Sequence, residues 1–552
     1  METVTGKIIQ EGFAVGPLRV WRRREAPPPD AAAVLPPAQE RARFEAASAQ
    51  AGAQLEALCR RVRAELGEDG AAIFEIHRMM LEDEDYLDAV YAAIDGGCAA
   101  AAAVLTAGGQ FAAVFAAMDD AYMKARAADV EDVSRRVAAI LDGRGGEAPF
   151  SAGGPFLLAA EELAPSELAQ LDRSRLLGLV TRWDSVTSHT AILARTMGVP
   201  ALTGVAIRGN WDGRRSILDA AAGRLTIDPD PALLSAAEQT LRRRQTEAAQ
   251  LLRLRGKPNV TLDGHEIEVC ANIGGPGDLP LVLQNDAQGV GLFRSEFLFL
   301  EAERLPTEEE QFAAYRQVVE AMAGKRTVIR TLDLGADKQA PCLPLEKEEN
   351  PALGLRAIRL CLTRRDLFKT QLRAILRAAA FGKTAILLPM IVSLWEVREV
   401  KALLEECRAE LGSRGEPFGE AELGVMIETP AAVLIAEELA REVEFFSLGT
   451  NDLTQYALAI DRRNPALEPF CDARHPAVLR MIRYTAEAGR RHGCRVGVCG
   501  QLAADPALTE DFLRMGIDEL SVPPAAILPL RRSIRGLDLG GERRQGEGPP
   551  QF

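Results

Sequence analysis

The feature that most constrains the fold is a regular alternation of short apolar runs and helical segments between residues 257 and 540. Most of these runs are continuously apolar, which is typical of strands buried on both faces of a parallel sheet. Eight such strands separated by helical segments over about 280 residues predict a (β/α)8 TIM barrel. The predicted strands are 266–273, 289–294, 326–333, 385–391, 422–428, 445–449, 495–499 and 519–522.

The N-terminal half is organised differently. Between residues 38 and 141 the chain has no proline and is rich in Ala, Leu, Glu and Arg, which predicts three to five amphipathic helices. Short strands and helices alternate in 155–230, and the first 20 residues also alternate like strands. The predicted fold class is therefore multidomain α/β: an N-terminal α/β domain (1–24 and 145–230) with an inserted helical bundle (25–144), a linker helix (231–256), the barrel (257–540) and a polar tail (541–552).

Composition excludes several classes of function. The chain of 552 residues has a net charge of −14, which argues against nucleic acid or an anionic membrane surface as the main partner. No apolar run reaches the ~18 residues of a transmembrane helix, and no signal segment is evident at the N-terminus. Nine dispersed cysteines without a CxxC pair predict reduced thiols, a cytoplasmic protein and no zinc site.

One of the five histidines, His189, lies in the run TSHTAILAR. Thr187 and Ser188 are favourable N-cap residues, and the apolar residues that follow at helical spacing end before Gly198, which should terminate the helix. Free backbone N–H groups at a helix N-terminus favour a bound anion, and a neutral imidazole there can accept a phosphoryl group. Taken alone, His189 is also compatible with a half-buried structural histidine.

Residues that can do chemistry follow the predicted barrel strands, at the carboxyl ends where TIM barrels build their active sites. Arginines can hold phosphate and carboxylate groups, two carboxylates on adjacent strands suit Mg²⁺, and a thiol can deliver a proton to carbon. The predicted set comprises Arg294, Arg330, Lys338, Arg356, Glu428, Asn451, Asp452, Arg462 and Cys499. Its chemistry is phosphoryl transfer from a small phosphate ester that also carries a carboxylate.

Each group has an expected role in that transfer. Arg294 and Arg330 should hold the phosphoryl group in the transition state. Mg²⁺ on Glu428 and Asp452 should bridge substrate oxygens and stabilise an enolate, and a thiol would then protonate the enolate carbon. The acceptor histidine must move between the barrel mouth and a second partner, which gives the linker at 231–256 a mechanical role.

Together these runs resemble Enzyme I of the bacterial phosphotransferase system, the phosphoenolpyruvate–protein phosphotransferase family, over essentially the whole chain. The resemblance implies a phosphohistidine α/β domain, an inserted helical domain that docks the small carrier protein HPr, and a barrel that binds phosphoenolpyruvate (PEP) and forms a homodimer. The matching strings are TSHTAILAR, LDGHEIEVCANIG, GVGLFRSEFLFL, LPTEEEQFAAY, RTLDLGADK, KEENPALGLRAIR, QLRAILRAAAFGK, VMIETPAA and FFSLGTNDLTQYALAIDR.

Carried over residue by residue, the resemblance implies His189 as the phosphohistidine and Cys499 as the proton donor. It implies that the protein transfers a phosphoryl group from PEP to His189 and on to HPr, releasing pyruvate, as the first step of sugar uptake. The positions matching PEP contacts are Arg294, Arg330, Asn451, Asp452 and Arg462; Glu428 and Asp452 match the Mg²⁺ ligands, and Lys338 and Arg356 are further active-site positions.

The sequence departs from the family pattern at several positions. Asp184 and Ser185 stand where the family usually has two glycines before TSH, so side chains replace bare backbone beside the expected phosphohistidine. Ala336 replaces a glycine of the family's DxGGDK run, and Gln501 replaces a glutamate, which removes one carboxylate. The C-terminal tail is shorter than is typical of the family, which leaves a terminal helix in question.

Alternatives remain open at this point. A pyruvate–phosphate dikinase or PEP synthase shares the TSH histidine and the barrel, but it needs an ATP-binding domain for which no region is evident. A non-catalytic regulator that keeps the fold is the second alternative. In the helical block, Met79, Met80 and Leu81, close to His77, form either an HPr-docking patch or bundle core. Sugar-type and nitrogen-type carriers are both possible, although no GAF-like domain is evident before residue 1, which mildly favours the sugar branch.

Overall fold

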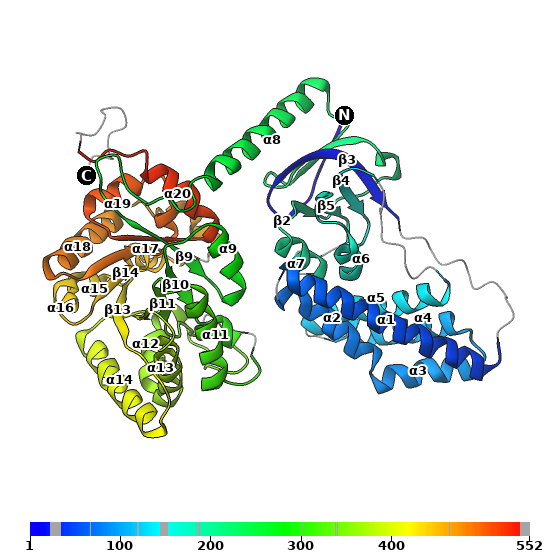
Figure 1. The fold of residues 1–552 in the computed structure, drawn as a ribbon, viewed down its shortest axis with the longest axis horizontal. Helices are drawn as coiled ribbons and strands as arrows, with labels where there is room; N and C mark the ends of the chain where they lie inside the picture. Colours follow the sequence, from blue (N-terminus) through cyan, green and yellow to red (C-terminus); the bar gives the residue numbers. More distant parts are fainter. Residues whose placement is uncertain are drawn as a thin grey trace. The chain divides into compact units, whose positions relative to one another are not determined.

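The computed structural model describes residues 1–22, 35–66, 68–118, 121–143, 153–183, 185, 188–300, 302–336, 338, 340–462 and 464–540. The chain divides into two compact units, Met1–Glu247 and Ala248–Phe552. Each unit has its own sheet and its own apolar core (Figure 1). The predicted multidomain α/β class, with a helical bundle in the N-terminal half and a C-terminal barrel, is confirmed. Among the described residues, no helix combines the length and the apolar character needed to cross a membrane.

The sheet of the first unit brings together segments from both of its ends. Its strand order is β1-β8-β7-β3-β4-β5-β6-β2. The central strand β3 pairs antiparallel with β7 and parallel with β4, so the first strands of the chain are integral to this sheet. The strands are β1 (Glu2–Thr5), β2 (Lys7–Gln10), β3 (Phe13–Trp21), β4 (Phe156–Ala160), β5 (Leu176–Thr181), β6 (Ala201–Thr203), β7 (Arg215–Asp219) and β8 (Arg224–Ile227).

In the described part of the chain, five helices lie between β3 and β4. They form a bundle (Figure 1). They are α1 (Pro37–Leu66), α2 (Glu68–Leu81), α3 (Glu84–Asp95), α4 (Ala100–Ala116) and α5 (Ala121–Leu141). Their core is continuous with that under α6 (Pro165–Gln170) and α7 (His189–Thr196) of the α/β part: Phe44 and Phe74 belong to the same buried cluster as Leu168 and Leu193. The bundle therefore packs directly against the helix that begins at His189.

The long helix α8 (Pro231–Leu252) follows the first sheet, where the sequence predicts a linker. Its first half packs on that sheet, because Leu234, Ala237 and Leu241 form a small apolar cluster with Val15 and Ile217. Only Ala237 of this helix is buried, which agrees with its charged sequence. The α/β part of the unit also contains the short 3-10 helix η1 (Gly209–Trp211).

The second unit is a closed barrel of eight parallel strands in the order β10-β11-β12-β13-β14-β15-β16-β9. All eight predicted strands are present. Two of them end clearly earlier than predicted, because the chain leaves the sheet after Arg330 in β11 (predicted 326–333) and after Leu388 in β12 (predicted 385–391). The strands are β9 (Glu268–Ile273), β10 (Val290–Arg294), β11 (Thr327–Arg330), β12 (Thr384–Leu388), β13 (Ala421–Ile427), β14 (Phe445–Leu448), β15 (Arg495–Val498) and β16 (Glu519–Val522).

Helices surround this barrel (Figure 1). Their apolar residues form one buried cluster with those of the strands. The interior is filled by a separate buried cluster that includes Leu292, Val328, Leu387, Met426 and Cys499. The α-helices are α9 (Leu279–Gln284), α10 (Phe297–Leu300), α11 (Glu308–Ala321), α12 (Ala357–Thr363), α13 (Arg365–Ala379), α14 (Leu394–Arg414), α15 (Pro430–Leu434), α16 (Ala436–Ala440), α17 (Thr450–Leu458), α18 (Pro476–His492), α19 (Thr509–Met515) and α20 (Ile527–Ile534). The 3-10 helices are η2 (Pro276–Asp278), η3 (Pro351–Leu353), η4 (Pro465–Phe470), η5 (Gln501–Ala504) and η6 (Pro524–Ala526).

Candidate active site

His189 is the first residue of α7 and lies at the helix N-terminus, as the sequence predicts. Ser188 is the N-cap, and its hydroxyl accepts a hydrogen bond of 3.1 Å from the backbone N–H of Ala191. Thr187, the other predicted capping residue, lies outside the described residues, as does Asp184. The His189 side chain is 20% exposed, so part of the ring is accessible at a helix end that favours anions.

The imidazole of His189 is oriented by a carboxylate from the bundle. Its Nδ1 lies 3.1 Å from Oδ1 of Asp129 on α5. An ionised carboxylate can only accept, so Nδ1 must carry the proton and donate it. The lone pair of the neutral ring is then on Nε2, which is the nitrogen left to act as a nucleophile.

Asp129 is held in its ionised form by its neighbours. It is 1% exposed, and Arg126 Nη1 lies 3.2 Å from its Oδ2. Burial opposes ionisation, but the contacts with His189 and His77 outweigh it and lower the pKa of Asp129 to about 2. The group next to the predicted phosphoryl acceptor is therefore a permanent hydrogen-bond acceptor at neutral pH.

At the carboxyl end of the barrel, Arg330 is fixed by two buried carboxylates. Its Nη2 lies 2.8 Å from Glu296 Oε1, and its Nη1 lies 3.3 Å from Asp333 Oδ2. Burial disfavours its charge, yet the carboxylates, Glu296 first, raise its pKa well above the usual range. The guanidinium is thus a rigid cation, as a group that holds a phosphoryl oxygen must be.

Asp333 joins three of the predicted cations. Arg356 Nη2 donates a hydrogen bond of 2.7 Å to its Oδ1, and Lys338 Nζ lies 3.3 Å from its Oδ2. Burial raises the pKa of Asp333, but Arg330, Arg356 and Lys338 together hold it well below its usual range. Arg356 also contacts Tyr456, whose hydroxyl donates to the backbone of Ala352, so α17 is tied to the loop before α12.

Glu428 follows β13, and the carboxylates of Asp452 and Asp333 are among its charged neighbours. It is 1% exposed, and its Oε1 accepts a hydrogen bond of 2.7 Å from the backbone N–H of Met390. Burial and the nearby Asp452 and Asp333 raise the pKa of Glu428 to about 8. Within the described part of the chain, Glu428 forms no ion pair, and the charge of Arg330 offsets only part of the rise in its pKa. Two neighbouring buried carboxylates such as Glu428 and Asp452 fit a divalent cation with oxygen ligands.

The other predicted residues lie around the start of α17. Asp452 is 8% exposed and lies 3.4 Å from Arg462 Nη2. The side-chain oxygen of Asn451 accepts a hydrogen bond of 3.1 Å from the backbone N–H of Gln501, so the residue that replaces the family's glutamate still anchors this rim. Arg294, at the end of β10, is exposed and forms no ion pair among the described residues, which leaves its charge available to a ligand.

Two glycines at strand ends allow this rim to assemble. A Cβ on Gly449 would lie 2.7 Å from Oε2 of Glu428. A Cβ on Gly500 would lie 1.9 Å from the hydroxyl oxygen of Thr450. Only a residue without a side chain fits such close approaches, so β14 and β15 reach the site with bare backbone.

Cys499 follows β15 and faces the interior of the barrel. It is 4% exposed, and its Sγ lies 3.5 Å from the carbonyl oxygen of Leu448. Burial raises the pKa of its thiol to about 11, and the nearby Glu428 acts in the same direction. The thiol is therefore protonated at neutral pH, which is the form that a proton donor requires.

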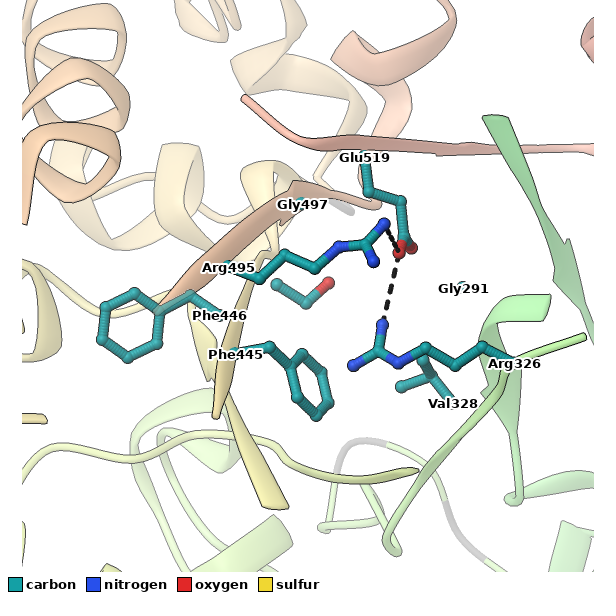
Figure 2. Close-up of a pocket in the computed structure, with 9 residues that line it drawn as sticks. Gly291, Arg326, Val328, Phe445, Phe446, Arg495, Gly497 and Glu519 are labelled. Atoms are coloured by element: carbon teal, nitrogen blue, oxygen red, sulfur yellow. Dashed lines mark hydrogen bonds and ion pairs between the residues drawn. The ribbon is translucent and has the colours of Figure 1, made fainter. Parts of the chain in front are cut away.

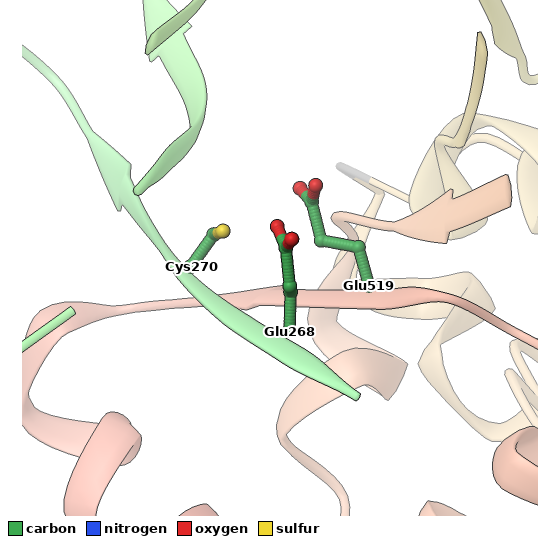
Figure 3. Close-up of side chains that lie close together, drawn as sticks. All are labelled: Glu268, Cys270 and Glu519. Carbon is green, nitrogen blue, oxygen red and sulfur yellow. The ribbon is translucent and has the colours of Figure 1, made fainter. Parts of the chain in front are cut away.

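A second polar cluster lies at the opposite, amino-terminal end of the barrel strands. Figure 3 shows Glu268, Cys270 and Glu519 with their polar atoms within 4.8 Å of one another. Figure 2 shows Arg326 and Arg495 reaching Glu519, at 3.3 Å and 3.5 Å. Arg495 also pairs with Glu268 and Arg326 with Glu422, and burial raises the pKa of Cys270 well above its usual value.

The cavity beside these arginines, lined by Gly291, Phe445 and Glu519 among others, has a volume of about 10 Å³. That is room for about one water molecule and excludes a substrate of several heavy atoms. This end of the barrel therefore holds a structural ion-pair network, and the candidate active site is at the other end.

The structure reveals neighbours that sequence reasoning missed. Asp129 lies within a long helix whose pattern predicts only a bundle, and nothing in the sequence around His77 indicates that it approaches Asp129. Glu296 could have been chosen from its position two residues after Arg294 at a strand end. Met390 has a φ of 58°, unusual for a side-chain-bearing residue, and its backbone N–H faces Glu428. Asp337 and the tail from 541 onward lie outside the described residues.

Comparison with known proteins agrees with this geometry. Residues 5–126 match the family of the PEP-utilising enzyme N-terminal domain, 154–223 its mobile domain, and 248–539 its PEP-binding domain. A phosphoenolpyruvate-protein phosphotransferase of Bacillus sp. (strain S) is 43% identical over 502 residues, which are 90% of this chain and 87% of that protein. Proteins of the same name from Haemophilus influenzae (42% over 506 residues) and Staphylococcus carnosus (41% over 503 residues) each match 90% of this chain and 88% of their own length. The chain therefore belongs to the Enzyme I family of phosphoenolpyruvate-protein phosphotransferases, within the PEP-utilising enzymes.

Proposed function

We propose that this enzyme transfers the phosphoryl group of PEP to Nε2 of His189, passes it on to an HPr-type carrier protein and releases pyruvate, the first step of the PEP-dependent phosphotransferase system. The observation that carries the proposal is the rim at the carboxyl end of the barrel. There, Arg330, Arg356 and Lys338 converge on Asp333. The charges of Asp452 and Asp333 act on Glu428, and the charge of Glu428 acts in turn on the thiol of Cys499.

Binding of PEP would use the cations of this rim. Arg294 offers an uncommitted charge to a phosphoryl oxygen, while Arg330, fixed by Glu296 and Asp333, presents the rest of its guanidinium in one orientation. Arg462 and the side chain of Asn451 lie beside Asp452 and suit the substrate carboxylate. Because Glu296 and Asp333 fix Arg330 before binding, it can stabilise charge that develops in the transition state at little reorganisation cost.

Enzymes of this family need a divalent metal, and we propose that it is Mg²⁺ held by Glu428 and Asp452. The fit rests on the chemistry of this donor set: Glu428 is buried, forms no ion pair among the described residues, and lies near the carboxylate of Asp452, which after burial contributes most to its raised pKa. A bound Mg²⁺ would offset that charge and polarise substrate oxygens. Arg330, Lys338 and Arg356 balance Asp333 separately, so the other carboxylates of the rim stay available.

The chemical step breaks the bond between phosphorus and the enol oxygen of PEP and forms a bond between phosphorus and Nε2 of His189. Asp129 keeps the proton on Nδ1, so the Nε2 lone pair is available for the attack. The enol oxygen leaves as the enolate of pyruvate. The thiol of Cys499 gives its proton to the enolate carbon, which yields pyruvate and a thiolate that solvent reprotonates.

The helical bundle and the barrel have further proposed roles, in carrier docking and in dimerisation. The helical bundle would dock HPr, and Met79 on α2 is suited to such a contact because it is 56% exposed, whereas Leu81 is buried in the core. The barrel would form the homodimer interface. We propose that the protein acts in the cytoplasm. We propose the boundaries 1–24 with 145–230, 25–144, 231–256 and 257–540 as the functional division, with 541–552 as a tail.

The comparisons do not favour the alternatives of a dikinase or a non-catalytic regulator, since relatives of matching length carry the phosphotransferase name over 90% of this chain. The reaction itself is tested by incubating the protein with Mg²⁺ and PEP labelled with ³²P, with and without HPr-type carriers of the sugar and nitrogen branches. We expect label on His189, passage to one carrier and release of pyruvate. The variant His189→Ala should form no phosphoprotein while its circular dichroism is unchanged. Acid-labile label that persists in His189→Ala would show that another residue is the acceptor.

A further inference from the structure

His77 on α2 is a buried histidine that the proposed mechanism does not use. Its side chain is 0% exposed, and its Nε2 lies 3.3 Å from Asp129 Oδ1, the oxygen that also faces His189. Its Nδ1 lies 3.9 Å from Asp132 Oδ2. The edge of Phe74 packs against the ring, with centroids 5.9 Å apart and planes at 84°. An imidazole in this position stands between two carboxylates and cannot touch a substrate.

His77 interacts with Asp129 and Asp132 mainly through charge, and with Phe74 through packing. Neither ring nitrogen has a hydrogen bond of good geometry among the described residues. Burying a polar ring without such bonds costs free energy, so we expect His77 to have an effect on its neighbours. The carboxylate of Asp129 can rotate about its terminal torsion, and a partner on each side restricts it to one orientation.

The partners of Asp129 come from three helices. Arg126, on the same helix as Asp129, lies 3.2 Å from Oδ2, while His77 on α2 and His189 on α7 share Oδ1. If His77 is removed, His189 is the only side chain among the described residues that remains at Oδ1 of Asp129. The carboxylate could then turn toward Arg126 and leave the Nδ1 of His189 without its acceptor.

The far side of His77 is anchored as well. Asp132 Oδ1 accepts a hydrogen bond of 2.7 Å from the hydroxyl of Ser166, and Oδ2 accepts one of 3.3 Å from its backbone N–H. Ser166 belongs to α6 of the α/β part. A chain of contacts therefore runs from α6 through Asp132, His77 and Asp129 to the helix that begins at His189, and it crosses between the bundle and the α/β part twice.

From this geometry we propose that His77 is a positioning residue: it holds Asp129 Oδ1 toward His189 Nδ1 and so keeps His189 in the tautomer whose Nε2 is the nucleophile. The proposal rests on the proposed function in one respect, the role of His189 as acceptor. It gives the inserted bundle a second task besides carrier docking, which is to complete the surroundings of the phosphoryl acceptor with residues of α2 and α5.

The test measures the tautomer of His189 directly. Full-length protein with ¹⁵N-labelled histidine is examined by long-range ¹H–¹⁵N correlation spectra, which distinguish the two neutral tautomers. Wild type should show His189 protonated on Nδ1. In His77→Phe, which keeps an aromatic ring of similar size, His189 should become a mixture of tautomers. His77→Gln, which keeps a polar donor near Asp129, should lie between them. Tyr86→Phe is the matched control, because it removes a buried bundle hydrogen bond of 2.9 Å to Ser134 without touching Asp129.

The same proteins are then mixed with PEP and Mg²⁺ in a single turnover. Loss of an orienting neighbour should slow phosphorylation of His189 roughly tenfold in His77→Phe and less in His77→Gln, with little change in Tyr86→Phe. An unaltered tautomer in both His77 variants would overturn the inference, as would a rate loss in Tyr86→Phe equal to that in His77→Phe. If wild type is not phosphorylated on His189 at all, the proposed function fails, whereas the tautomer comparison still decides the role of His77.

Discussion

Two buried carboxylates, one in each unit of the chain, have pKa values shifted in opposite directions. Asp129 lies among Arg126, His77 and His189, and its contacts with His189 and His77 lower its pKa to about 2 despite burial. Glu428 lies beside Asp452 and Asp333, and burial with these like charges raises its pKa to about 8. The difference shows that opposite charges at hydrogen-bonding distance outweigh burial at Asp129, whereas burial and nearby like charges dominate at Glu428, where we propose that a divalent cation binds.

The largest effect is expected from removing that cation or its ligand. Chelation of divalent metal, or Glu428→Gln, should lower pyruvate formation by about 10³-fold, since a metal supplies several kcal/mol of transition-state stabilisation. Steady-state rates at increasing Mg²⁺ measure this. Mg²⁺ should restore the chelated wild type but not the variant; full activity of Glu428→Gln at ordinary Mg²⁺ would mean that Glu428 is not a ligand.

The next effect concerns proton delivery at the same mouth. Cys499→Ala should slow pyruvate formation by about 10²-fold, because the enolate loses a placed proton donor. Phosphorylation of His189 in a single turnover should be affected much less, since that step breaks a different bond. Comparing labelled phosphoprotein with pyruvate release separates the two steps, and equal losses in both would assign Cys499 a role in binding instead.

The counterpart in the first unit is Asp129→Asn, which should slow phosphorylation of His189 about tenfold or more by removing the acceptor for Nδ1. It should also lower stability with a defined pH dependence. A carboxyl whose pKa falls from 3.8 to about 2 on folding contributes about 2 kcal/mol above pH 4, and this contribution disappears as pH falls toward 2.

Urea unfolding of wild type and Asp129→Asn at several pH values measures that contribution. The difference in unfolding free energy should be largest at neutral pH and should shrink as pH falls below 4. A difference that is constant from pH 7 to pH 3 would contradict the assignment of a stabilising ionised carboxylate.

The smallest effect on catalysis is expected at the amino-terminal end of the barrel. Glu519→Gln should leave steady-state activity unchanged, because Glu519 lies in the network with Arg326 and Arg495 and not at the catalytic rim. It should lower the free energy of unfolding by about 1–3 kcal/mol, since part of a buried charge pair is lost. Thermal unfolding measures the stability of Glu519→Gln, and a steady-state assay measures its activity. A large loss of activity with normal stability would mean that this cluster contributes to catalysis.

Much of the fold was predictable from local pattern. Apolar runs such as those of β12 and β14 are continuous because the strands are buried on both faces, and their spacing by helical segments predicts the barrel. The rim residues were predictable for a related reason: Arg330, Glu428 and Cys499 lie at or just after the ends of parallel strands, and such ends meet on one face of any TIM barrel. Their roles in catalysis stay predictions that the experiments above test.

The sequence by itself thus determined the architecture, the position of His189 at a helix start and the set of groups that gather at the barrel mouth, because each depends on period and on strand direction. Only the tertiary structure decided which groups touch. The contact between Asp129 and His189 joins residues 60 positions apart on crossing helices, and His77 approaches the same oxygen from a third helix. Such contacts depend on how helix faces pack, and no local pattern of residues encodes that packing.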